Sequence, residues 1–214
     1  MMRRPQVMAE GCDRMTRVKL CGMSRPEDMA AANVCRPDMI GFVFWEKSKR
    51  CVTRPQAAAL RALLDPEIMA VGVFVDEAPE KVAALLNDGI IDMAQLHGQE
   101  DEAYIAALRA LTDKPLMKAF VIHGPEDVAA AARSSADLVL VDSGKGSGRS
   151  FNWQLLAGLL RPYFLAGGLD PDCVGSALAA LAPYGVDVSS GIETEGRKDL
   201  EKMRRFTRQV RTAG

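Results

Sequence analysis

The stretch Ile68-Met69-Ala70-Val71-Gly72-Val73-Phe74-Val75 is an apolar run that contains no charged residue. Strands buried on both faces give continuous runs of this kind, because helices cover both sides of a parallel sheet. Similar runs recur along the chain, and the eight candidate strands begin near Val18, Asp38, Ile68, Asp92, Pro115, Asp137, Pro162 and Gly185. Successive starts lie 20 to 30 residues apart, which leaves room for one helix after each strand.

The intervening segments carry helix signals. Residues 24–27 and 53–56 both fit a capping box, in which a hydroxyl caps the helix and Glu or Gln follows three residues later. One apolar face with helical spacing runs through Val174, Ala177, Leu178 and Leu181. The segment between Phe151 and Leu160 has the weakest helical pattern of the eight units.

Eight strand–helix units are compatible with a closed (β/α)8 barrel or with an open doubly wound sheet. A dinucleotide-binding sheet would place G-x-G-x-x-G after its first strand, and residues 21–24 lack this motif. Eight units in just over 200 residues fit a compact barrel. We therefore predict an α/β protein with a single TIM barrel of eight parallel strands and surrounding helices over residues 17–214. We expect residues 1–16 to form a flexible N-terminal extension.

Composition narrows the class of function. Of the 214 residues, 48% are hydrophobic and 26% charged, and the net charge of −1 gives no field that would favour nucleic acid. No apolar run is long enough to span a membrane, and the N-terminal segment lacks the apolar centre of a signal peptide, so we expect a cytoplasmic protein. The five cysteines form no C-x-x-C pair, so we predict neither a metal site nor a disulfide framework.

In this fold the active site lies at the C-terminal ends of the strands. Glycine-rich segments follow the last three strands. Gly167 and Gly168 come after the seventh, Ser190 and Gly191 after the eighth, and Gly144 and Gly146 after the sixth. Exposed backbone N–H groups in such turns bind phosphate, although tight turns alone also require glycine. Taken together, the positions favour a phosphate site.

Two residues at strand ends are candidates for acid–base chemistry. Asp142 ends an apolar run. It is either a general acid, if burial raises its pKa, or a residue that caps the next turn. Cys21 ends the first strand. It is either a base, if its pKa is lowered, or simply a small buried apolar residue.

Other polar residues lie near the same edge. Arg50 suits a carboxylate ligand or belongs to a solvated basic loop. Lys118 interrupts an apolar strand, which is costly unless the ammonium is paired or used. Gln95 and His97 follow the fourth run, where His97 is either a site residue or a core residue satisfied by a neighbour.

Several segments, taken in chain order, resemble the phosphoribosylanthranilate isomerase family. The most specific are Val18-Lys19-Leu20-Cys21-Gly22-Met23-Ser24-Arg25 and Gly185-Val186-Asp187-Val188-Ser189-Ser190-Gly191-Ile192-Glu193. Between them lie Gly41 to Phe44, Lys47 to Arg50, Gln95 to Gly98, Leu140 to Ser143 and Leu165 to Leu169. The similarity extends from Val18 to the last helix. One departure is Trp45-Glu46, where the family more often has Tyr-Pro.

The resemblance implies the third step of tryptophan synthesis, an Amadori rearrangement of N-(5'-phosphoribosyl)anthranilate without cofactor or metal. It implies that Asp142 is the general acid, that Cys21 is the general base and that Arg50 holds the anthranilate carboxylate. The glycines after strands six to eight would hold the phosphate. Lys19 and Asp187 are further site candidates without an assigned step. The expected partner is a small-molecule substrate, with no nucleic acid or membrane, and the expected assembly is a monomer or homodimer.

Three alternatives remain at this point. A histidine-pathway isomerase catalyses a similar step, but it usually has aspartate in place of Cys21 and two related half-barrels, and no internal repeat is visible here. Indole-glycerol phosphate synthase would need a catalytic lysine and glutamate set that we do not find. A non-catalytic phosphate binder would be indicated by loss of Asp142 or Cys21, and both are present.

Overall fold

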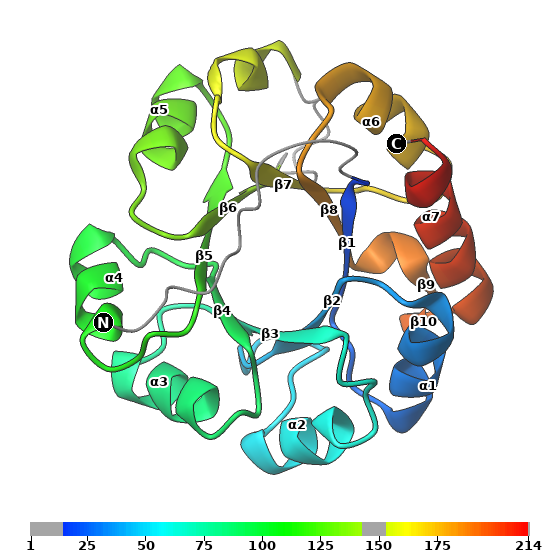
Figure 1. The fold of residues 1–214 in the computed structure, drawn as a ribbon, viewed down its shortest axis with the longest axis horizontal. Coiled ribbons are helices and arrows are strands. Elements are labelled where there is room, and N and C mark those ends of the chain that lie inside the picture. The colour runs from blue at the N-terminus through cyan, green and yellow to red at the C-terminus, as the bar shows by residue number, and fades with distance from the viewer. Residues whose placement is uncertain (1–14, 143–152, 214) are drawn as a thin grey trace.

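The computed structural model describes residues 15–142 and 153–213, and its centre is a closed barrel of eight parallel strands (Figure 1). The strands are β1 (Arg17–Cys21), β2 (Met39–Val43), β3 (Met69–Phe74), β4 (Met93–Leu96), β5 (Leu116–Val121), β6 (Leu138–Asp142), β7 (Tyr163–Ala166) and β8 (Gly185–Val188). Each strand pairs with the next, and β8 pairs with β1, so the barrel has no open edge. The predicted fold class is confirmed, and every predicted strand start lies within one residue of the observed one.

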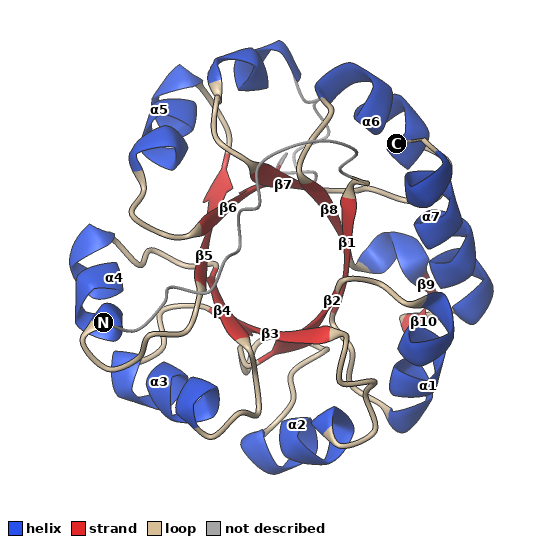
Figure 2. Ribbon diagram, viewed as in Figure 1, coloured by secondary structure: helices blue, strands red, loops and turns tan. Residues whose placement is uncertain are grey.

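Helices surround the barrel as an outer ring (Figure 2). They are α1 (Pro26–Cys35), α2 (Arg54–Arg61), α3 (Pro79–Asn87), α4 (Glu102–Arg109), α5 (Pro125–Arg133), α6 (Val174–Leu181) and α7 (Leu200–Thr212). The weakly patterned segment before β7 forms only a short 3-10 helix, η1 (Trp153–Gly158). Among the described residues, no helix is long and apolar enough to cross a membrane.

The two predicted capping boxes fared differently. Thr53 caps α2 as expected, with its backbone N–H donating to Gln56 Oε1 at 2.8 Å. The box at residues 24–27 is wrong by one position, because α1 begins at Pro26. Asp28, not Glu27, accepts the backbone N–H groups of Ser24 and Arg25, at 2.9 and 3.0 Å.

The barrel interior decides which strand residues reach the site. Side chains alternate between the two faces of a strand, so residues two apart share a face. An apolar cluster that includes Met93, Leu138 and Leu140 fills the interior. By the same alternation Asp142 continues the inward face of β6, and Gln95 continues that of β4, toward the C-terminal ends. The outward-facing residues form the larger core between the barrel and the helices.

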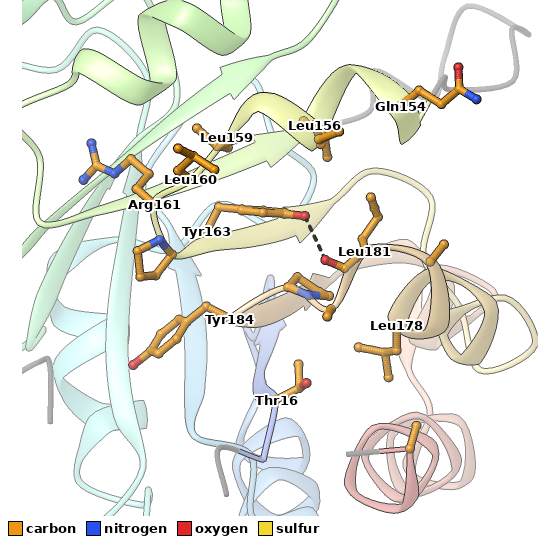
Figure 3. Close-up of a pocket in the computed structure, with 16 residues that line it drawn as sticks. Thr16, Gln154, Leu156, Leu159, Leu160, Arg161, Tyr163, Leu178, Leu181 and Tyr184 are labelled. Carbon is orange, nitrogen blue, oxygen red and sulfur yellow. Dashed lines mark hydrogen bonds between the residues drawn. The ribbon is translucent and has the colours of Figure 1, made fainter. Parts of the chain in front are cut away.

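A groove of about 950 Å³ lies between η1 and α6 (Figure 3). Its lining includes Tyr163 at the start of β7 and Tyr184 just before β8, so it opens at the N-terminal ends of these strands. The Tyr163 hydroxyl donates to the carbonyl of Leu181 across it, at 3.4 Å. Active sites of this fold occupy the opposite end of the barrel, so this groove lies away from the expected site.

Candidate active site

The Cys21 thiol lies at the C-terminal end of β1, in a space that Gly41 leaves open. The two residues face each other across the β1–β2 pair. A Cβ atom on Gly41 would lie only 2.7 Å from Cys21 Sγ, which is closer than two non-bonded atoms can approach. Cys21 itself is 7% exposed. The glycine of β2 therefore determines where the thiol can sit.

A buried ion pair lies beneath the thiol. Lys19 and Asp187 are opposite each other in the β1–β8 pair, and Lys19 Nζ lies 2.9 Å from Asp187 Oδ1. Lys19 has no exposed surface, and the charges of Asp187 and Cys21 raise its pKa against the effect of burial. Burial raises the pKa of the Cys21 thiol, while the positive charges of Lys19 and Lys198 favour its thiolate form. The site thus provides cations that favour a thiolate against the opposing effect of burial.

His97, which follows β4 directly, and Asp142 at the end of β6 face each other. His97 Nε2 lies 3.9 Å from Asp142 Oδ2, and both side chains are partly exposed. The Gln95 side-chain amide lies 3.1 Å from His97 Nδ1, and an amide N–H at this position suits the tautomer that carries its proton on Nε2, the nitrogen nearer Asp142. Burial lowers the pKa of His97, although the nearby Asp142 charge opposes this, so the imidazole is neutral at pH 7. Gln95 is fully buried, and its Oε1 has no partner among the described residues.

Arg50 comes from the loop after β2 and lies directly against the backbone of Gly22. A Cβ atom on Gly22 would meet Arg50 Cδ at 2.4 Å, and Gly22 has a φ of +81°, so glycine is required there twice over. Arg50 Nε and Nη2 donate to the two carboxylate oxygens of Glu193, at 2.5 and 2.7 Å. Arg50 is therefore neither a solvated basic residue nor an unpaired one, because an internal carboxylate holds it.

The loops after β7 and β8 come together. Gly167 and Gly168 have φ values of +94° and +61°, a conformation that glycine adopts without strain. A Cβ atom on Gly191 would lie 2.0 Å from the carbonyl oxygen of Leu169, so the two loops make close backbone contact. Ser190 and Gly191 begin the short 3-10 helix η2 (Ser190–Ile192). The other predicted phosphate ligands, Gly144 and Gly146, lie outside the described residues.

Lys118 does not belong to this site. It has the opposite alternation from Met117 and Ala119, which face the interior, so it faces the helix layer. Its ammonium pairs with Glu100 Oε2 at 3.0 Å and donates to the carbonyl of Gly98 at 2.8 Å. The lysine is paired, as a buried cation must be, and it fixes the loop that follows His97.

Two residues of the site have no assigned role in the sequence reasoning. Glu193 is the last residue of the segment Gly185 to Glu193, which indicates the family but no role for this glutamate, and Lys198 lies outside the segments that resemble the family. Both come from a hairpin that follows η2, with strands β9 (Glu193–Thr194) and β10 (Arg197–Lys198). Lys198 Nζ donates to Glu193 Oε1 at 2.8 Å and to the carbonyl of Ser189 at 2.9 Å. Strands of two residues are too short to give a periodic pattern in the sequence. The only signal for this hairpin is its charged residues, such as Glu193 and Lys198.

No group of His, Cys, Asp and Glu within residues 15–142 and 153–213 is arranged to hold a metal ion. The polar residues at the C-terminal ends of the strands instead form an acid–base set. A thiol and a carboxylate lie on the inward face, with a neutral imidazole beside the carboxylate and cations beside the thiol. Such a set can move protons to and from a bound substrate.

Comparisons with known proteins point to one family. The family model for N-(5'-phosphoribosyl)anthranilate isomerase matches residues 18–209. The isomerase of Endomicrobium trichonymphae is 42% identical over 194 residues, which covers 88% of this chain and 95% of that protein.

Two solved structures cover 92% of this chain and all of their own chains, each at 32% identity. One is a phosphoribosylanthranilate isomerase in complex with reduced 1-(o-carboxyphenylamino)-1-deoxyribulose 5-phosphate, with a TM-score of 0.83. The other presents monomers generated from the dimeric Thermotoga maritima enzyme, with a TM-score of 0.82. By sequence and by fold, the chain belongs to the N-(5'-phosphoribosyl)anthranilate isomerase family.

Proposed function

We propose that this isomerase acts on N-(5'-phosphoribosyl)anthranilate with Asp142 as general acid and Cys21 as general base. The observation that carries the proposal is the shared inward face. Cys21 ends β1 and Asp142 ends β6, and the Lys19–Asp187 pair lies within electrostatic reach of both the Cys21 thiol and the His97 ring beside Asp142. A substrate at the mouth of the barrel would meet both groups.

The acid step opens the sugar ring. Protonated Asp142 transfers its proton to the furanose ring oxygen, the C1′–O bond breaks, and the anilino nitrogen lone pair forms a Schiff base. His97 supports this step in the tautomer that carries its proton on Nε2, because that nitrogen lies 3.9 Å from Asp142 Oδ2 and its N–H dipole stabilises the carboxylate left behind. We propose that Gln95 contributes by fixing that tautomer of His97.

The base step moves the C2′ proton. The Cys21 thiolate removes this proton, and the C–H electrons form the C1′–C2′ double bond of an enolamine, which neutralises the iminium nitrogen. Ketonisation then gives 1-(2-carboxyphenylamino)-1-deoxyribulose 5-phosphate. Lys19 and Arg50 interact with the Cys21 charge, so both favour the thiolate that the step requires. Each proton transfer contributes roughly 10²–10⁴ in rate.

Substrate binding is divided between two sides of the mouth. We propose that Arg50 binds the anthranilate carboxylate, and that Asp187 and Lys19 shape the floor under the sugar. The phosphate would bind the backbone N–H groups of Gly167, Gly168, Ser190 and Gly191, together with Gly144 and Gly146. Positive φ values at Gly167 and Gly168 and the close packing of Gly191 support such a cradle.

A monomer or a homodimer is the expected assembly, since the Thermotoga maritima relative is described as dimeric. Light scattering on the purified protein at micromolar concentration measures it. The small-molecule substrate is the expected partner, and no nucleic acid is expected. The cytoplasmic location stays a prediction from the sequence. The flexible extension at residues 1–16 stays a prediction as well, and residues 1–14 lie outside the described residues.

Loss of anthranilate fluorescence during turnover tests the function. The purified parent should convert phosphoribosylanthranilate, and inorganic phosphate should inhibit competitively. A folded parent that gives no turnover would contradict the proposal. Inhibition by phosphate without turnover would instead indicate a non-catalytic binder.

A further inference from the structure

Glu193 holds Arg50 by one side of its guanidinium group only. Its two oxygens accept hydrogen bonds from Nε and Nη2, which is the side edge of the group. Among the described residues, Nη1 has no hydrogen-bond partner. A guanidinium has five N–H donors, and Glu193 uses two of them. The end edge, formed by Nη1 and the second N–H of Nη2, is thus available to a second carboxylate in the same planar geometry.

The position of Glu193 is itself fixed. Its side chain is 6% exposed, and Lys198, which is 2% exposed, donates to the same oxygen that Arg50 Nε contacts. Burial alone would raise the pKa of Glu193, but hydrogen bonds from Arg50 and Lys198 lower it to about 2. The carboxylate is therefore charged at all physiological pH values. Lys198 also donates to Ser189, whose hydroxyl donates to the carbonyl of Cys21 at 3.1 Å.

The opposite side of Arg50 is fixed by the turn after β1. The aliphatic part of its side chain lies against Gly22, so close that a Cβ atom on residue 22 would overlap Arg50 Cδ. A long side chain that would otherwise sample many rotamers is thus held between Gly22 and Glu193. Its charge stays next to Cys21.

From this geometry we propose that Glu193 is a positioning residue that orients Arg50 for the anthranilate carboxylate of the substrate. This inference rests on the carboxylate-binding role proposed above for Arg50. It predicts that Glu193 acts on the recognition of one substrate group. Loss of Glu193 should weaken carboxylate binding without affecting the sugar and phosphate contacts.

Two inhibitors separate these effects. One is the reduced product, in which the ketone is an alcohol, and the other is the same compound with a plain phenylamino ring that lacks the carboxyl group. Glu193→Gln should weaken binding of the carboxylated inhibitor about tenfold and leave the other within twofold. KM should rise by a similar factor, while kcat changes less than threefold. Glu195→Gln is the matched control, since it makes the same change on an exposed residue of the same hairpin.

A second variant guards against a misfolded product. Glu193→Asp keeps the charge beside Lys198, but it is one methylene too short to reach both Nε and Nη2. It should show the same selective loss. In an Arg50→Lys background, which cannot form the bidentate pair, neither Glu193 variant should reduce the preference for the carboxylated inhibitor further.

Equal weakening of both inhibitors would overturn the proposal, because Glu193 would then merely support the loop. Unchanged binding of both would overturn it as well. If the parent itself bound the two inhibitors equally, the carboxylate role of Arg50 would fail first, and the role of Glu193 would fail with it.

Discussion

Replacing Gly41 by alanine should disable the thiol without touching any group that binds substrate. The new Cβ atom would lie 2.7 Å from Cys21 Sγ, whereas non-bonded heavy atoms prefer about 3.5–4.0 Å. Either the thiol or strand β2 must therefore move by roughly 1 Å. A displacement of about 1 Å from the reacting geometry can cost about 10² in rate. We expect kcat to fall about 100-fold and KM to change little.

Steady-state turnover, followed by anthranilate fluorescence, measures this effect, and urea unfolding checks the fold. Overpacking should cost about 1–3 kcal/mol of stability, and Cys21→Ala in the same chain should restore most of it by removing the sulfur. Gly175→Ala in α6 is the control, since its new Cβ atom meets no other atom within 4 Å. A folded Gly41→Ala variant that turns over within twofold of the parent would refute the reasoning.

Three further predictions concern the charges and loops around the site. Lys19→Met should lower the free energy of unfolding, measured by urea unfolding, by about 3–5 kcal/mol, because it leaves a buried carboxylate unpaired. The control Lys114→Met, at an exposed lysine, should change it by less than about 0.5 kcal/mol, and equal effects of the two variants would contradict the prediction. The pKa of Glu193 is lowered to about 2, so its stabilisation is present above its ordinary pKa and is lost as pH falls toward 2. Between pH 6 and pH 2.5 the Glu193→Gln variant should therefore lose about 2 kcal/mol less stability than the parent loses. An unchanged pH dependence would speak against the ion pair. Gly191→Ala should raise the inhibition constant of inorganic phosphate at least tenfold, because its Cβ atom would collide with the carbonyl of Leu169; unchanged inhibition would place the phosphate elsewhere.

The fold was predictable because its signal is repeated. Eight apolar runs at regular spacing leave few alternatives, and each run is buried on both faces, as a parallel barrel requires. Helix starts were less certain. At α1 the N-cap is Arg25, and Asp28 accepts the backbone N–H groups of Ser24 and Arg25, whereas the capping pattern expected a hydroxyl at the cap and Glu27 as the acceptor.

The orientation of the candidate site residues was predictable where a residue's place on a strand decides which face its side chain takes. Cys21, Asp142, Gln95 and Asp187 follow from alternation along their strands once the barrel is accepted. The pairing of Arg50 with Glu193 was not predictable in the same way, because 143 positions separate these residues. Arg50 stands in a loop, and Glu193 begins a strand of only two residues.

Lys118 shows the limit of the same reasoning. A lysine in an apolar run signals that the ammonium is paired or used, but its face follows only from the register of its neighbours. The interior positions of Met117 and Ala119 place it outside the barrel.

Single-turnover rates of the parent, Cys21→Ser and Asp142→Asn test the central claim most directly. With enzyme in excess over phosphoribosylanthranilate, the rate reports chemistry rather than product release. The account predicts rapid conversion by the parent, a rate lower by about 10²–10⁴ in each variant, and retained affinity for the reduced product. A rate within tenfold of the parent in either folded variant would contradict the assignment of the acid–base pair.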